Sequence, residues 1–208
     1  IEKKDLVDKN LEILKKKTFW CAVSTHKGEE NICLNTHINL KKTYNDLITI
    51  IVPRHIKRCI EISNLCKKYN LSSQILDDKE LINNEKEIII INSFGTLSKF
   101  YNYSKSVFIG KSMIKKLEKV SGQNPIEAAK LRCKIYHGPY VYNFKEIYDL
   151  LKSYKISEEV NDEKELYKKL TRDLKNSEDH EDKTADIIND MGQKILDKTT
   201  REINKLLI

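Results

Sequence analysis

The chain has 208 residues, of which 39% are hydrophobic and 33% are charged. This length and apolar content are enough to bury a substantial core, which argues against global disorder. No apolar run approaches the roughly 18 residues that a membrane-spanning helix needs, so the sequence predicts no such helix. Lys and Arg outnumber Asp and Glu by 38 to 31, a net charge of +7 that favours anionic partners: nucleic acid, anionic lipid or phosphorylated small molecules.

Short apolar runs alternate with amphipathic segments along most of the chain. Strands are predicted at 19–24, 47–52, 73–76, 87–92, 106–109 and 134–137, with a last short one before Val160. Helices are predicted at 29–42, 56–69, 97–103 and 126–131, and in most of the chain after Asn143. Continuous apolar strands separated by amphipathic helices predict an α/β fold with a Rossmann-like, doubly wound parallel sheet and a helical C-terminal tail.

The same pattern gives an expected domain organisation. Residues 1–18 are expected to be a linker or helix that continues from a preceding domain, because the chain opens without Met and reads as a fragment or a processed chain. Residues 19–178 form the Rossmann-like domain, and 179–208 a final helix that packs back on it or on a partner domain. Five cysteines without a C-x-x-C pair predict reduced, mostly buried thiols of a cytosolic protein.

Glycine and proline are scarce, with six Gly and three Pro in the whole chain. Eight of these nine residues lie just beyond a predicted strand or at the start of a predicted helix. Ligands of doubly wound sheets bind beyond the carboxyl ends of the strands, near the point where the strand order reverses. The sequence therefore predicts a binding site at that edge of the sheet.

The segment 121–129, S-G-Q-N-P-I-E-A-A, supports two interpretations. Asn124 as N-cap, Pro125 at the first helical position and Glu127 at the third would form a capping box, which needs no ligand. The same geometry would let a phosphate approach at Gly122 and meet free N–H groups, with Glu127 accepting from the hydroxyls of a ribose.

Three further segments follow predicted strands. In V-P-R-H-I-K-R, Arg54 is a candidate for a phosphate and His55 for a sugar or base, although an exposed basic turn would look the same. Ser24 and Thr25 are candidate caps of the next helix, and Gly95 opens a predicted helix whose N–H groups could meet a base or phosphate. F-I-G-K-S at 108–112 lacks the leading Gly of a phosphate loop, because position 105 is Lys. Scattered His residues without H-E-x-x-H predict no metal site.

In this order and spacing the segments resemble one family, the bacterial Kdo (3-deoxy-D-manno-octulosonic acid) transferases of lipopolysaccharide assembly. That family carries S-T-H-x-G-E-E, P-R-H-x-x-R, G-E-L, G-H-N-x-x-E-P-A and G-P-x-x-x-N-F. These motifs fall here at 24–30, 53–58, 95–97, 122–129 and 138–144. Thr96, Gln123 and Ala128 depart from the pattern, which puts in doubt any role of a carboxylate at 96 or an imidazole at 123.

The resemblance implies the C-terminal, donor-binding half of a GT-B glycosyltransferase. The parent enzyme would move Kdo from CMP-Kdo to lipid A precursor at the cytoplasmic face of the bacterial inner membrane, without a cofactor or metal. Its catalytic base and acceptor site would lie in an N-terminal domain, so this fragment is expected to be soluble and inactive alone. The implied donor-binding residues are Pro53, Arg54, Phe94, Gly95, Thr96, Asn124, Pro125, Ile126 and Glu127, supported by Ser24, Thr25, His55 and Gly122.

Two other classes of function fit part of the pattern. A GT-B domain that binds a UDP-sugar, in a transferase or an epimerase, would share the Gly-rich turn and the Glu but not the S-T-H and P-R-H segments. A basic module that binds nucleic acid would share the net charge only, and the resemblance implies no nucleic-acid partner.

Overall fold

The computed structural model describes residues 3–93, 95 and 100–175, together with positions 188, 190, 192, 193 and 200. The strands of this part of the chain form one seven-stranded sheet in the order β3-β4-β2-β1-β5-β6-β7, and all neighbouring strands are parallel. The predicted Rossmann-like parallel sheet is confirmed. The strands are β1 (Phe19–Thr25), β2 (Ile48–Pro53), β3 (Ser73–Leu76), β4 (Ile88–Ile91), β5 (Ser106–Ile109), β6 (Lys134–His137) and β7 (Ser157–Glu159).

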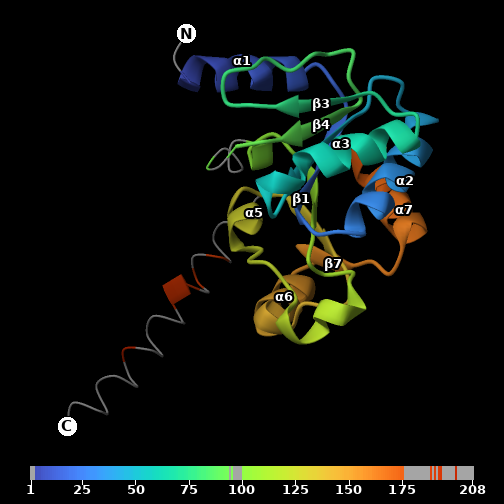
Figure 1. Cartoon of the computed structure of the whole chain (residues 1–208). Coiled ribbons are helices and arrows are strands. Elements are labelled where there is room, and N and C mark those ends of the chain that lie inside the picture. The colour runs from blue at the N-terminus through green and yellow to red at the C-terminus, as the bar shows by residue number, and fades with distance from the viewer. Residues whose placement is uncertain are drawn as a thin grey trace.

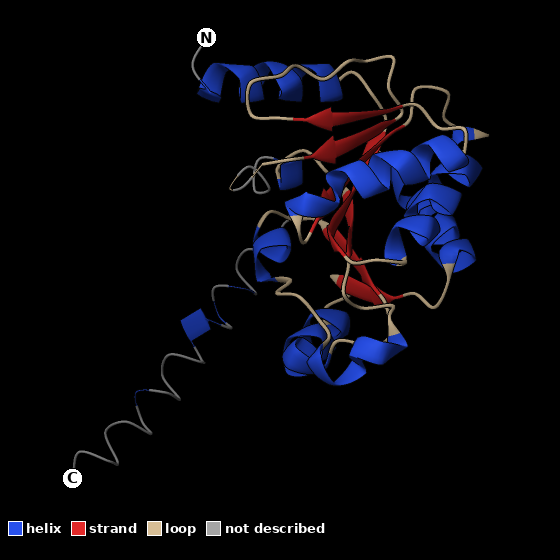
Figure 2. Ribbon diagram, in the orientation of Figure 1, coloured by secondary structure: helices blue, strands red, loops and turns tan. Residues whose placement is uncertain are grey.

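Helices cover both faces of the sheet (Figures 1 and 2). The α-helices are α1 (Lys3–Leu14), α2 (Glu29–Lys41), α3 (Cys59–Lys68), α5 (Ile126–Lys130), α6 (Lys145–Ser153) and α7 (Glu163–Lys175). The 3-10 helices among the described residues are η1 (Ile56–Arg58), η2 (Lys115–Val120) and η3 (Tyr142–Phe144). In the part of the chain that the structure describes, no helix is both long and apolar enough to cross a membrane.

Each strand sends alternate side chains to opposite faces, which is why its apolar residues divide between two cores. On one face Cys21, Val23 and Ile50 pack with side chains of α1, α5 and α6. On the other face Trp20 and Ala22 pack under α2 and α7, and Ile51 packs under α3. Because both faces are covered, the central strands are largely apolar, as predicted, although β2 carries the buried Thr49 between Ile48 and Ile50.

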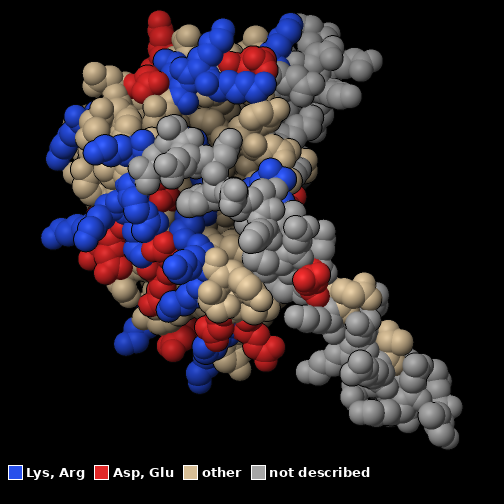
Figure 3. Space-filling model, turned by 180° about the vertical axis from the view of Figure 1, so that it is seen from behind, with Lys and Arg blue, Asp and Glu red and all other residues tan. Residues whose placement is uncertain are grey.

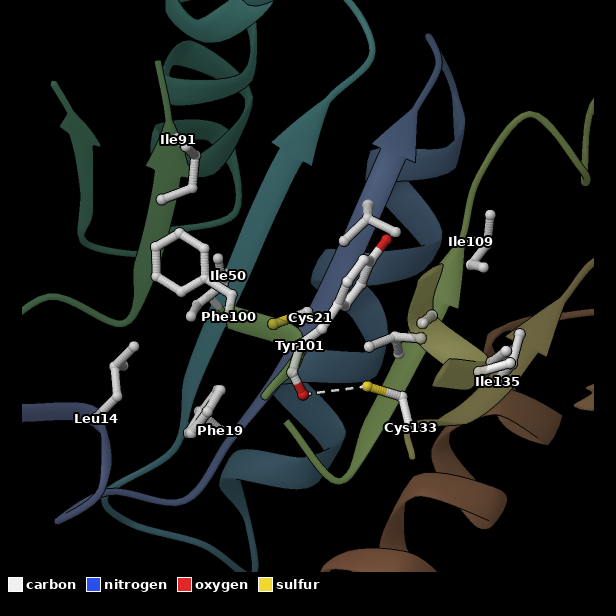
Figure 4. Close-up of a cluster of buried hydrophobic side chains, with 14 of the residues drawn as sticks. Leu14, Phe19, Cys21, Ile50, Ile91, Phe100, Tyr101, Ile109, Cys133 and Ile135 are labelled. Atoms are coloured by element: carbon white, nitrogen blue, oxygen red, sulfur yellow. Dashed lines mark hydrogen bonds between the residues drawn. The ribbon is translucent and has the colours of Figure 1, made fainter. Parts of the chain in front are cut away.

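The first of these cores runs across the width of the sheet. Figure 4 shows Leu14 and Phe100 at the β4 side and Ile135 at the β6 side, with Cys21 between them. The Cys133 thiol donates a hydrogen bond to the carbonyl oxygen of Tyr101 at 3.2 Å. Phe100 and Tyr101 are helical, in agreement with the helix predicted at 97–103, whose residues 97–99 lie outside the described part.

The N-terminal helix α1 packs on this domain at the β3 edge (Figure 1). Leu11 and Leu14 are buried in the first core. Asn10 donates to the carbonyl of Glu80 at 3.0 Å and accepts from the N–H of Ile82 at 2.7 Å. At the other end of the chain Ile188 is buried against the same core, but most of 179–208 lies outside the described residues, so the predicted final helix stays a prediction.

The segment predicted as one helix over 56–69 has two parts. Residues 56–58 form η1, and the α-helix begins only at Cys59. A tight first turn of this kind is frequent at helix N-termini. It brings the Arg58 side chain back toward the start of α2, where it meets Glu30.

Candidate functional site

The strand order reverses at β1. The chain passes from β1 to β2, β3 and β4 on one side, and then crosses to β5 on the other side of β1. In a parallel sheet the loops that follow β1, β2 and β5 all leave from the same edge, and the crevice between diverging loops is where doubly wound sheets bind ligands. The predicted residues at 24–25, 53–55 and 122 lie in or beside these loops.

A buried carboxylate joins the loops that follow β1 and β5. Glu29 is fully buried, and its Oε2 accepts from the N–H groups of His26 and Lys111, both at 2.8 Å. Its Oε1 accepts from Ser112 at 2.8 Å and from Met113 at 3.0 Å. Four main-chain donors thus converge on one side chain, and they fix the two loops relative to each other. We call these four donors, together with the carboxylate, the Glu29 clamp.

Gly110 is required where these loops meet. A Cβ at position 110 would lie 2.7 Å from both Glu29 Oε2 and the Thr25 Cα, and 2.8 Å from the Ser24 carbonyl oxygen. Two of those atoms are main chain and cannot swing away. The Gly of F-I-G-K-S therefore serves close packing of the loops, and Lys111, with φ of 57°, turns the chain immediately afterwards.

A second contact joins the loops that follow β1 and β2. Arg58 binds the fully buried Glu30 through two parallel bonds, from Nη1 to Oε1 at 2.7 Å and from Nη2 to Oε2 at 3.1 Å. Nearby, the N–H of Arg54 donates to the carbonyl of Thr25 at 3.1 Å. The last residues of S-T-H-K-G-E-E and of P-R-H-I-K-R thus form an ion pair between a buried glutamate and a partly buried arginine, which the sequence interpretation missed.

The exposed side chains at this edge are the ones that can reach a ligand. Arg54 and His55 are exposed, and the Arg54 guanidinium has no hydrogen bond or ion pair within the described residues. Pro53 and Thr25 are buried, and the Thr25 hydroxyl has no hydrogen-bond partner there either. Arg54 is therefore free to bind an anion at the end of β2 without losing an existing contact.

His26, which the sequence analysis did not select, lies beside these residues. Its ring is 5.8 Å from that of His55, centroid to centroid, in an edge-on arrangement. Its Nδ1 donates to the Ser24 carbonyl at 3.1 Å, which leaves Nε2 as an acceptor. Partial burial lowers the pKa of His26, and the hydrogen bond to Ser24 opposes this effect only in part. The Ser24 carbonyl and the neighbouring His55 ring thus orient the His26 imidazole, and its lowered pKa favours the neutral form.

The turn that precedes α5 is attached to the loop after β5. The N–H of Gly122 donates to the carbonyl of Lys111 at 2.8 Å, and Gly122 has φ of +91°. A Cβ there would lie 3.1 Å from the Cα of Val141. Tyr148 of α6 also holds this turn, since its hydroxyl donates to the Gln123 carbonyl at 3.0 Å. The turn is therefore fixed in place from two sides.

The predicted capping box is only half present. Asn124 Oδ1 accepts from the N–H of Ile126 at 3.0 Å, but within the described residues Glu127 makes no return bond to Asn124. The helix begins at Ile126, one position later than a capping box would need. Glu127 is exposed and has no hydrogen bond or ion pair in the described part of the chain. Burial is the main reason why the pKa of Tyr101 is raised, and the negative charge of the Glu127 carboxylate adds a smaller contribution in the same direction.

Gly95 is exposed, with φ of +75° and open space around it. Phe94 and Thr96 lie outside the described residues. Gly138, by contrast, is buried: its N–H donates to Ser112 Oγ at 2.8 Å, and a Cβ would lie 2.2 Å from the Ser112 carbonyl oxygen. The G-P-x-x-x-N-F segment thus begins with a packing glycine.

The structure therefore brings the predicted residues together in two groups. Ser24, Thr25, Pro53, Arg54 and His55 adjoin one another through the pairing of β1 with β2. The turn that holds Gly122 and Asn124–Glu127 connects to them through Lys111 and the Glu29 clamp. A groove of about 670 Å³ opens elsewhere, between the first turn of α2 and the length of α3. Its lining includes Lys27, Arg58 and Ile60 but none of the predicted donor-binding residues.

Charge on the surface does not by itself mark a binding face. Figure 3 shows Lys and Arg side chains interspersed with Asp and Glu side chains on the face opposite to that of Figure 1. The net charge of +7 thus forms no single continuous patch on the atoms visible there. In the part of the chain that the structure describes, no three His, Cys, Asp or Glu side chains are grouped as metal ligands would be.

Comparison with known proteins finds glycosyltransferases among the relatives of this chain. Over 188 residues the chain is 29% identical to the 3-deoxy-D-manno-octulosonic acid transferase of Haemophilus influenzae, an alignment that covers 90% of this chain and 42% of that protein. The chain is homologous to the Kdo transferases. It is also 33% identical over 172 residues to a bifunctional glycosyltransferase/methyltransferase of Fusobacterium nucleatum, covering 81% of this chain and 25% of that protein. No family model matches.

Among solved structures, the C-terminal CMP-Kdo binding domain of WaaA from Acinetobacter baumannii has the same fold as this Kdo transferase homologue. The TM-score is 0.72 at 21% sequence identity, and the match covers 93% of this chain and 98% of that domain. The chain spans less than half the length of the two relatives named above. Its length corresponds instead to that of the solved domain, which the match covers almost completely.

Proposed function

We propose that this chain binds the nucleotide of CMP-Kdo and is the donor-binding part of a glycosyltransferase that moves Kdo to lipid A precursor. The observation that carries the proposal is the convergence of S-T-H-K-G-E-E, P-R-H-I-K-R and G-Q-N-P-I-E at the edge of the sheet where its strand order reverses. Homology to Kdo transferases supports it. In this proposal the acceptor site, the catalytic base and any attachment to the inner membrane would lie in another part of a longer enzyme.

The exposed residues of this edge have chemistry suited to a nucleoside monophosphate ester. The free guanidinium of Arg54 would bind the phosphate through charge-assisted hydrogen bonds, which arginine makes in pairs with phosphate oxygens. The unpartnered carboxylate of Glu127 would accept from both ribose hydroxyls. Gly95 and the turn before α5 would offer main-chain N–H groups, for which the departures at Thr96, Gln123 and Ala128 matter little.

Binding would hold the leaving group in place for transfer. As the glycosidic bond to Kdo breaks, negative charge develops on the CMP phosphate, and a cation bound to that phosphate, such as Arg54, would stabilise the charge more in the transition state than before it. This chain thus contributes recognition and leaving-group stabilisation. No metal or cofactor enters the proposed reaction.

Titration of the chain with three ligands tests the proposal. CMP should bind saturably, UMP at least about tenfold more weakly, equivalent to ~1.4 kcal/mol, and a short oligonucleotide not measurably. Tighter binding of UMP than of CMP would favour a UDP-sugar enzyme instead. Binding of the oligonucleotide alone would favour a nucleic-acid module, and either result would refute the proposal.

A further inference from the structure

The Glu29 clamp has the form of an anion-binding nest that is already filled. Three consecutive N–H groups, those of Lys111, Ser112 and Met113, point at one carboxylate, and the N–H of His26 completes the set. Successive main-chain N–H groups of this kind bind phosphate or sulfate in other proteins. Here the chain supplies its own anion, which explains why F-I-G-K-S looks like the end of a phosphate loop and yet lacks its leading glycine.

The four N–H groups of the clamp take the place of the water molecules that would otherwise hydrogen-bond to the Glu29 carboxylate, which is completely buried. Glu29 has no ion pair with Lys or Arg within the described residues, so the four N–H groups are what compensates its removal from water. Both carboxylate oxygens accept two bonds each. An amide at the same place offers one accepting oxygen and one NH₂ group, which would face two N–H donors. Neither Gln nor Ala can therefore satisfy the four donors.

The clamp also fixes the position of the residues that face the proposed ligand. One of its donors is the main chain of His26, whose neighbour Thr25 accepts from Arg54 N at 3.1 Å. On the other side Lys111 accepts from Gly122 N at 2.8 Å, at the start of the turn that leads to Glu127. The two groups of candidate residues are thus joined through this one carboxylate.

We propose that Glu29 is a positioning residue whose buried carboxylate, acting as an internal anion, sets the relative placement of the β1, β2 and β5 loops and thereby the geometry of the nucleotide site. The last clause rests on the proposed function. Glu29 touches no ligand itself. Its effect on binding is transmitted through His26 and Lys111.

Chemical rescue tests this inference. Glu29→Ala removes a carboxymethyl group, and acetate supplies the same atoms. In the 208-residue chain, acetate should raise the melting temperature of Glu29→Ala by about 3 °C or more beyond the effect of chloride at equal ionic strength, a shift that for a chain of this size corresponds to ~1 kcal/mol. The unaltered chain should show no difference between the two salts.

Two more variants separate positioning from general loss of stability. Leu40→Ala, a fully buried position at the far end of α2, is the matched control: it should lower the melting temperature, show no preference for acetate and keep CMP affinity within twofold. Glu29→Gln keeps the side-chain size if Glu29→Ala fails to fold. CMP affinity should fall at least about tenfold in either Glu29 variant at temperatures where the protein is fully folded, and acetate should restore part of it in Glu29→Ala.

Amide chemical shifts give a readout that does not depend on CMP. The N–H resonances of His26, Lys111, Ser112 and Met113 should move together in Glu29→Gln and stay unchanged in Leu40→Ala. If they do not move, or if folded Glu29 variants bind CMP within twofold of the unaltered chain, the positioning role is refuted. If the shifts and the acetate effect appear but the unaltered chain does not bind CMP, the clamp stands and the proposed function fails.

Discussion

Arg54 and Arg58, the two arginines of P-R-H-I-K-R, lie in opposite surroundings. Arg54 is exposed and its side chain has no partner in the described part of the chain, whereas Arg58 is paired with the buried Glu30. Because both arginines lie in the same short segment, the sequence alone does not show which of them is exposed and which is paired. The structure assigns Arg58 to the fold and leaves Arg54 as the arginine that can meet a ligand.

Arg54→Ala should weaken CMP binding and leave the fold intact. Loss of a charge-assisted hydrogen bond is worth roughly 1.5–3 kcal/mol, or about tenfold or more in affinity. Arg58→Ala is the matched comparison, because it leaves Glu30 buried without its partner and should destabilise the chain by about 3–5 kcal/mol. Calorimetric titration and thermal melts of both variants check this. CMP affinity within twofold for Arg54→Ala would reduce Arg54 to a surface turn residue.

Glu127→Gln separates ligand binding from helix capping. Because Glu127 makes no capping bond in the described structure, the substitution should change the free energy of unfolding by no more than ~0.5 kcal/mol. A ribose offers two hydroxyl donors, and an amide accepts only one of them, so CMP affinity should fall by about tenfold. A CMP analogue without the ribose hydroxyls is the control and should bind both forms equally. Unchanged CMP affinity would mean that Glu127 is not part of the site.

At the scale of elements, a charged network holds α7 against β6 and β7. Glu158 of β7 accepts from Lys169 at 2.6 Å and from Arg172 at 3.0 Å, and pairs with Lys134 at 2.8 Å. Partial burial acts to raise its pKa, but these three cations together lower the pKa to about 2. The network therefore favours the ionised carboxylate in the folded chain.

This network makes the stability of the sheet edge depend on pH. With a folded-state pKa near 2 and an ordinary value of 4.5, Glu158 stabilises the fold fully above pH 4.5, and this contribution is lost as the pH falls toward 2. Glu158→Gln should therefore be less stable than the unaltered chain above pH 4.5. Urea unfolding of both chains across this range should show the difference shrinking as the pH falls. A constant difference would mean that the ion pairs do not stabilise α7.

The elements were predictable to the extent that their signals are local. Runs such as Ile88–Ile91 are apolar at every position, because both faces of the sheet are covered, and this pattern can be recognised without a structure. The contacts that shape the site are not local. Glu29 and Lys111 are in contact although 82 positions separate them in the sequence, and Glu30 and Arg58 are separated by 28 positions. Both glutamates are in S-T-H-K-G-E-E, but their sequence context favours a helix start and does not reveal the partners.

At the scale of the whole molecule, the chain has a closed core on each face of its sheet but spans less than half of its relatives' length. It should therefore melt in one cooperative transition and bind CMP, yet transfer no Kdo from CMP-Kdo to a lipid A precursor. Differential scanning calorimetry and a transfer assay check both statements. Measurable transfer of Kdo would contradict the proposal that the catalytic base and the acceptor site lie outside this chain. Absence of a cooperative melt would show that the domain does not fold alone.

All five cysteines are buried, none more than 3% exposed. Burial raises the pKa of every one of these thiols, that of Cys66 to about 11 and that of Cys21 to about 12. A thiol-specific dye should thus not react with the native chain and should react only when the chain unfolds. The rate of labelling would therefore measure the rate at which the core opens. For the same reason a single cysteine placed at exposed Ile60 would carry a fluorophore without any need to remove the native five.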